Sequence, residues 1–160
     1  MTIRMLTSLT LALLLAAPAI AHESKTAPTP GNGISPKAQP AVKVIEQFSK
    51  ALASGDVALA GIYLAEDVLV LESGGAERSR EEYLGGHANH DAEFLKTAKV
   101  KVLSRTARVD GNFAWVGSES EVQTNNGQGA SQLSTETMVL KQTAKGWQIV
   151  HIHWSSRPKR

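Results

Sequence analysis

The hydrophobic period of the sequence changes once, near Thr97, and this change limits the possible folds more than any other feature. Before it, apolar residues recur at helical spacing. After it, they alternate with polar residues in four runs, at about residues 99–109, 113–123, 132–142 and 147–155. Such alternation is typical of strands with one buried face, and the Gly- and Asn-containing separators are typical of hairpin turns. We therefore expect helices first and an antiparallel meander of four strands after them.

Three helices are expected before the meander, with one strand between the second and the third. The first covers residues 41–52 and ends at Gly55, and the second begins after Asp56, whose carboxylate can cap its first turn. The third begins after Ser79 with a capping-box pattern and is interrupted by two glycines. Residues 67–71 form the expected strand. This order predicts an α+β fold in which three N-terminal helices pack on a curved antiparallel sheet to form a cone.

Three stretches of the chain are similar to one known family. They are residues 48–56 (FSKALASGD), 64–68 (LAEDV) and 146–157 (GWQIVHIHWSSR). Together with the element order, they resemble the nuclear transport factor 2-like superfamily, and within it the SnoaL-like domains of secreted members, over residues 41–157. The resemblance implies the cone-shaped, cystatin-like fold of that superfamily. It leaves the activity open, because the superfamily includes isomerases, dehydratases, cyclases, transport adaptors and oligomerisation modules.

Residues 1–21 have the pattern of a secretory signal peptide. Arg4 gives a positive start, an apolar run follows, and Ala19-Ile20-Ala21 is a small-residue cleavage site. The apolar run is shorter than the roughly 20 residues that span a bilayer. We therefore expect a periplasmic or secreted protein that begins at His22 and has no membrane attachment after cleavage.

The remaining chain divides into a linker, a domain and a short tail. Residues 22–40 are rich in Pro, Gly, Ser and Thr, and this composition predicts a flexible linker. The expected SnoaL-like domain covers residues 41–157. Residues 158–160 form a basic tail, which we expect to be a frayed terminus.

Charge and cysteine content exclude several functional classes. The formal net charge is +2, from 17 Lys and Arg against 15 Asp and Glu, which argues against a nucleic-acid-binding protein. The absence of cysteine excludes disulfides, thiol nucleophiles, thiolate zinc sites and iron–sulfur clusters. No organic cofactor is predicted. Any metal must therefore be held mainly by histidine or carboxylate ligands.

The four histidines after His22 form two close pairs and predict a divalent-metal site. His87 and His90 are neighbours on one face of the expected third helix, and His151 and His153 share one face of the last strand. The resemblance places the third helix near the concave face of the sheet, so the pairs could converge. Neutral imidazole ligands suit copper(II) or zinc. The alternative is that the histidines pack in the core or lie on a solvated surface.

A second hypothesis is acid–base catalysis in the cavity of the cone. Alignment of the first strand with the family's ketosteroid isomerase puts the carboxylate base at Glu72, and desolvation would raise its pKa towards neutrality. The family's dehydratase implies histidines with an acid, an arrangement that His87 with Asp91 or His151 could resemble. The candidate ligand-binding residues are Tyr63, Tyr83 and Trp147. The expected reaction classes are isomerisation, dehydration and cyclisation.

A third hypothesis is a non-catalytic dimerisation module. The last strand has apolar residues on both faces, which favours a homodimer that covers the face opposite the helices. Val150, Ile152 and Trp154 are the expected contact residues. Of the three hypotheses, the sequence favours a histidine-lined pocket that binds a divalent metal or a small ligand.

Overall fold

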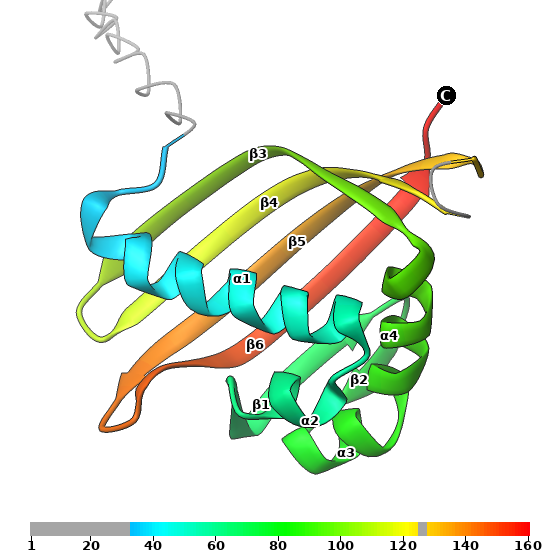
Figure 1. The fold of residues 1–160 in the computed structure, drawn as a ribbon. Coiled ribbons are helices and arrows are strands. Elements are labelled where there is room, and N and C mark those ends of the chain that lie inside the picture. The colour runs from blue at the N-terminus through cyan, green and yellow to red at the C-terminus, as the bar shows by residue number, and fades with distance from the viewer. Residues whose placement is uncertain (1–32, 125–127) are drawn as a thin grey trace, which may run out of the picture. The chain divides into compact units, whose positions relative to one another are not determined.

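Helices cover one face of a six-stranded sheet in the computed structural model, which describes residues 33–124 and 128–160. All of them belong to one unit, Gly31–Arg160. The expected signal peptide, His22 and most of the expected linker lie outside the described residues. Within these residues, no helix has the length and hydropathy needed to cross a membrane. The elements are η1 (Pro36–Ala38), α1 (Gln39–Ser54), α2 (Val57–Gly61), β1 (Leu64–Glu72), β2 (Gly75–Glu77), α3 (Arg80–Gly85), α4 (His87–Thr97), β3 (Lys99–Asp110), β4 (Phe113–Gln123), β5 (Ser131–Thr143) and β6 (Gly146–Pro158) (Figure 1).

The expected α+β fold is confirmed, but the sheet is mixed and not wholly antiparallel. Its strand order is β2-β1-β6-β5-β4-β3, and β3 to β6 form the predicted meander. Strand β1 pairs with β6 in parallel. Hairpins impose antiparallel pairing only on strands that follow each other in the chain, whereas α3, α4 and four strands separate β1 from β6. Strand β2 was not predicted, because three residues are too few to show alternation.

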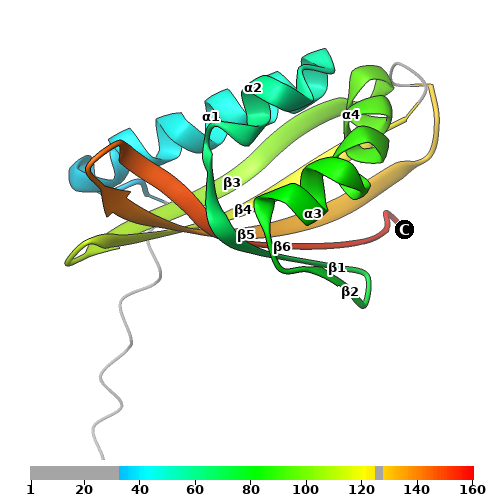
Figure 2. The same cartoon turned by 90° about the horizontal axis from the view of Figure 1, so that it is seen from below.

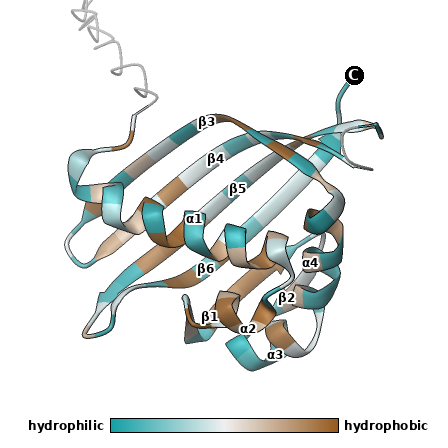
Figure 3. Cartoon of the chain, viewed as in Figure 1, coloured by the Kyte–Doolittle hydropathy of each residue, from teal (hydrophilic) through white to brown (hydrophobic). Residues whose placement is uncertain are grey.

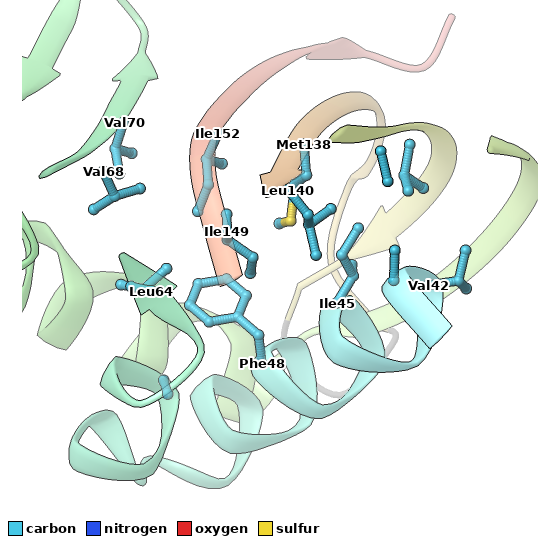
Figure 4. Packing of buried hydrophobic residues seen from close by; sticks show 14 of the residues in the cluster. Val42, Ile45, Phe48, Leu64, Val68, Val70, Met138, Leu140, Ile149 and Ile152 are labelled. Atoms are coloured by element: carbon cyan, nitrogen blue, oxygen red, sulfur yellow. The ribbon is translucent and has the colours of Figure 1, made fainter. Parts of the chain in front are cut away.

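The helix face of the sheet, meaning the face covered by the helices, carries the core (Figure 2). The apolar side of helix α1 packs there, and its residues Ile45 and Phe48 are completely buried. Figure 4 shows these side chains against Leu140, Ile149 and Ile152 of β5 and β6. Burial of a side chain such as Phe48 stabilises the fold by about 2–3 kcal/mol. The helix ends at Gly55, whose φ of 81° is the left-handed conformation that favours glycine.

Two predicted boundaries differ from the structure. The expected third helix is two helices, because the chain leaves helical geometry at Gly86 (φ −122°, ψ −107°) and begins again at His87. The last residues of the expected linker pack against the domain. Ile34 forms a bridge with Ala107 of β3, and Ala38 is completely buried. The described part of this segment therefore belongs to the packed domain.

A β-bulge in β6 changes which side chains face the helices. Strand β5 pairs Leu140 with Ile149 but Val139 with His151, so Val150 is the extra residue. Ile149 and Ile152 are both completely buried although they are three positions apart. The regular alternation that we expected for this strand is therefore wrong. Beyond the bulge, His151 and His153 lie on the outer face, opposite the helices.

Because of the bulge, two of the three residues expected at a dimer contact lie on the helix face. Ile152 is buried among core residues on the helix face, and Trp154 packs at a ring-centroid distance of 6.3 Å from Tyr83 of α3. Neither side chain is therefore available on the outer face for a second copy of the chain.

The face assignment in β6 predicts opposite results for neighbouring substitutions. Ile152→Ala removes a buried side chain and should lower the free energy of unfolding by about 2–5 kcal/mol. The matched substitution His153→Ala removes an exposed side chain and should change it by less than about 0.5 kcal/mol. Urea unfolding followed by circular dichroism measures both values. Equal losses in the two variants would contradict the bulged register.

Candidate functional site

A cavity of about 530 Å³ lies between α1, α4 and the helix face of the sheet. Its walls are mostly apolar, and its charged lining residues are few. The lining residues are Phe48, Ser49, Lys50, Leu52, Ala53, Glu72, Asp91, Phe94, Leu95, Val100, Ser120, Val122, Gln132, Ser134, Glu136, Trp154, Ser155 and Ser156. Apolar cavities with a few convergent polar groups are the usual form of small-molecule sites.

Strand register aligns one polar row across the sheet on the helix face. Glu72 of β1 pairs with Trp154 of β6, Trp154 with Glu136 of β5, Glu136 with Ser118 of β4, and Ser118 with Arg105 of β3. The next row towards the core contains Val70, Ile152, Met138 and Val116, all buried. The polar row therefore marks the boundary between the packed core and the cavity.

Hydrogen bonds hold most of this polar row in place. The Trp154 indole Nε1–H donates to Glu136 Oε2 at 2.9 Å, and the Ser118 hydroxyl donates to Glu136 Oε1 at 3.3 Å. Arg105 Nε donates to the Ser118 oxygen at 3.0 Å. Because Glu136 accepts from both sides, it fixes the indole of Trp154 against the cavity. Neither Glu136 nor Trp154 was predicted as a site residue by the sequence analysis.

Two carboxyl groups, Glu72 and Asp91, line the same cavity. Burial raises the pKa of Glu72, and the negative charge of Asp91 raises it further. Burial also raises the pKa of Asp91, while the Tyr83 hydroxyl opposes this by donating to Asp91 Oδ2 at 2.8 Å. Burial and the Asp91 charge raise the pKa of Tyr83, so its hydroxyl stays protonated. The site thus combines two coupled acids with a permanent hydrogen-bond donor.

A second charged pair, His87 and Glu77, lies beside these acids. His87 Nδ1–H donates to Glu77 Oε1, and this hydrogen bond and the Glu77 charge raise the pKa of the exposed imidazole. Glu77 itself is only 7% exposed and pairs with Val70, so it shares the helix face. The His87 charge lowers the pKa of Glu72, whereas the Glu77 charge raises it. Glu77 was missed from the sequence because its strand is so short.

The structure does not bring the two histidine pairs together. His87 and His90 lie edge to face at a ring-centroid distance of 6.4 Å beside the helix face. His151 and His153 lie on the outer face, where His151 Nδ1–H donates to the Leu69 carbonyl at 3.0 Å. Among residues 33–124 and 128–160, no three His, Cys, Asp or Glu side chains are arranged to hold a metal ion. The copper(II) or zinc hypothesis therefore lacks the convergence that it required.

The remaining predicted residues are divided between the cavity and the core. Glu72 and Asp91 line the cavity, and Tyr83 contacts it through Asp91 and Trp154. Tyr63 and Trp147 pack against the core cluster and are not among the cavity-lining residues. His151 faces away from the cavity, so it does not share a site with Glu72.

Comparison with known proteins identifies close structural relatives. The profile of the SnoaL-like domain matches residues 42–158. A candidate ketosteroid isomerase from Shewanella frigidimarina is 32% identical, with a TM-score of 0.70 over 76% of this chain and 98% of that chain. A candidate dehydratase of the NTF2-like family from Streptomyces avermitilis is 19% identical, with a TM-score of 0.66 over 78% and 96%.

A third structure supports the same fold. An NTF2-like protein with a cystatin-like fold from Novosphingobium aromaticivorans is 17% identical, with a TM-score of 0.62 over 72% of this chain and 78% of that chain. No curated protein matches the sequence.

The hydrogen bond from Tyr83 to Asp91 predicts a measurable titration change. Tyr83→Phe removes the donor that favours the ionised form, so the pKa of Asp91 should rise above its value in the unchanged protein. Carboxyl-carbon NMR as a function of pH measures this shift. Tyr63→Phe is the control, because Tyr63 lies outside the cavity lining. An unchanged Asp91 titration in Tyr83→Phe would contradict the assigned contact.

Proposed function

Because the chain belongs to the SnoaL-like domain family, we propose that it acts on a small, largely apolar molecule in this cavity by acid–base proton transfer. The single observation that carries the proposal is the position of two carboxyl groups with raised pKa values, Glu72 and Asp91, at a cavity whose helix wall is apolar. Paired carboxyl groups of this kind can supply both an acid and a base.

Glu72 is the proposed proton-transfer residue. Within the described residues, no donor hydrogen-bonds to its carboxyl group, so both oxygens are available to a ligand. Asp91 is already engaged by Tyr83 and acts through its charge, which makes Glu72 a stronger base. A carboxylate with a raised pKa removes protons from weak carbon acids more effectively than an ordinary one. Tyr83 is a positioning residue, since it acts through Asp91.

The names of two relatives are consistent with this reaction class. The Shewanella frigidimarina protein is named as a candidate ketosteroid isomerase, and the Streptomyces avermitilis protein as a candidate dehydratase. Both reactions involve proton removal from carbon, a step that Glu72 could perform here. At 19% identity, the second relative supports the fold alone.

A probe that needs only a carboxylate base in an apolar site tests the proposal. In 5-nitrobenzisoxazole, a base takes the C3 proton, the C–H electron pair forms the third bond of a nitrile, and the N–O bond breaks with its electron pair left on a coloured phenolate oxygen. The protein should accelerate this elimination, and Glu72→Gln should reduce the rate about 10²-fold or more, the usual contribution of a general base. The absorbance of the phenolate measures the rate. The matched control is Glu66→Gln, which changes an exposed glutamate of the same strand.

The pH profile of this elimination separates the roles of the two acids. The rate should rise with pH as Glu72 loses its proton, with a midpoint above the ordinary pKa of glutamate. Asp91→Asn removes a negative charge that raises the pKa of Glu72, so the midpoint should move to lower pH. Full activity in Glu72→Gln, or an unmoved midpoint in Asp91→Asn, would refute the assigned roles.

We also propose a homodimer through the outer face of the sheet. One row on this face runs across four strands, from Trp115 through Val139 and His151 to Leu69. Trp115 is 45% exposed and Leu69 is 36% exposed, although both are large apolar residues. Large exposed apolar residues on one face of a sheet favour association with another surface. An apolar surface can pack against an identical apolar surface, which suits contact with a second copy of the chain.

Trp115 should be the central contact of this dimer. Trp115→Lys should weaken dimerisation by at least about 30-fold, since buried interface tryptophans commonly contribute 2 kcal/mol or more. Sedimentation equilibrium measures the dissociation constant. Leu59→Lys is the control, because Leu59 is a similarly exposed apolar residue on α2. A protein that sediments as a monomer before any substitution would refute the homodimer.

A further inference from the structure

The two walls of the cavity differ in chemistry. The helix wall is apolar, with Phe48 and Leu52 from α1 and Phe94 and Leu95 from α4. The sheet wall beyond the polar row carries hydroxyl groups, and the part of β6 that lines the cavity is pale to teal in the hydropathy colours of Figure 3. A ligand that fills this cavity therefore meets an apolar surface on one side and hydrogen-bonding groups on the other.

Three serines form an aligned row on the sheet wall. Ser120 of β4 pairs with Ser134 of β5, and Ser134 pairs with Ser156 of β6. All three line the cavity. Adjacent strands lie about 4.8 Å apart, so the row extends over about 10 Å. Along β5, Ser134 is two residues from Glu136, a distance of about 7 Å.

The serine hydroxyls are available to a ligand. Within the described residues, none of the three has a side-chain hydrogen-bond partner, in contrast to Ser118 in the neighbouring polar row. A hydroxyl both donates and accepts. A row of such groups therefore complements ligand hydroxyls, which also do both, better than it complements a group that only accepts.

The charges of the cavity oppose an anionic ligand. Glu72, Asp91 and Glu136 line it, whereas Lys50 is its one basic lining residue within the described chain. Burial raises the pKa of both Glu72 and Asp91, and the Asp91 charge raises that of Glu72 further, so a ligand carboxylate or phosphate would add to this repulsion. A neutral hydroxylated group avoids this cost.

We propose that the cavity binds a neutral molecule in which an apolar ring system is joined to a hydroxylated ring, the chemistry of an aryl glycoside. This proposal rests on the cavity being the substrate site of the proposed function. The apolar ring contacts Phe94 and Leu95, while the hydroxyl groups bind Ser120, Ser134 and Ser156. The serines are thus specificity-determining residues. Because Glu72 pairs with Trp154, two residues before Ser156 on β6, the ligand would also lie beside the proposed base.

A matched pair of probes tests the role of the serine row. The first probe is 2-naphthyl β-D-glucopyranoside, and the second is 2-(tetrahydropyran-2-yloxy)naphthalene, which keeps both ring systems but lacks the sugar hydroxyls. Isothermal titration at pH 7 should show at least about tenfold tighter binding of the glucoside, equivalent to about one well-made hydrogen bond. The double variant Ser134→Ala/Ser156→Ala should remove most of that preference and leave the affinity for the ether unchanged.

The control variant and the alternative outcomes separate this proposal from the proposed function. Thr135→Ala changes a hydroxyl of β5 that lies on the outer face, so it should keep the glucoside preference. Equal affinity for both probes, equal losses for both in the double variant, or no binding of either probe below 1 mM would overturn the ligand class. If one of these outcomes occurs but the unchanged protein still accelerates elimination of 5-nitrobenzisoxazole, only the ligand class is overturned. Loss of both results would overturn the proposed function as well.

Discussion

The bulge at Val150 determines which residues of β6 meet the helices, and both faces of the sheet depend on it. A shift of one residue in a strand exchanges every side chain between the two faces. Here the extra residue lets Ile149 and Ile152 both enter the core. It also turns Trp154 towards Glu136, with which it hydrogen-bonds. Without the bulge, the residues beyond it would exchange faces, and His151 and His153 would point towards the helices in place of Ile152 and Trp154.

The position of the site follows from this register. Each row of paired residues runs across the strands, and polarity changes from one row to the next along the strands. The row with Val70, Ile152 and Met138 is buried under the helices, and the next row begins with Glu72. Side chains in an aligned row are neighbours, so hydrogen bonds join Arg105, Ser118, Glu136 and Trp154 across four strands. The cavity opens where apolar packing ends, and the polar row stays ordered there because its members bond to each other. Helices α1 and α4 then supply the opposite wall.

Sequence patterns predicted the parts of this structure that depend on local periodicity. The meander, the first helix and its end at Gly55 are local features, and so is the placement of Glu72 at the end of a strand. The parallel pairing of β1 with β6 was not predictable in this way, because it depends on a partner far along the chain. The bulge was not predicted either, since alternation in β6 is satisfied by apolar residues on both faces. The expected convergence of the histidines failed for that reason.

The burial of Glu72 and Asp91 beside the cavity lowers the free energy of unfolding at neutral pH. Their pKa values are higher in the folded state than in the unfolded chain, so the folded state binds their protons more tightly. This contribution to stability is fully present below the unfolded pKa values and is lost as the pH rises through the folded ones. The Tyr83 hydrogen bond to Asp91 and the charge of the protonated form of His87 both favour ionised acids and partly offset this cost. A carboxyl pair that served only the fold would be expected to have favourable partners for both members. Glu72 has no hydrogen-bond donor to its carboxyl group within the described residues, which fits a group that is kept free for a ligand.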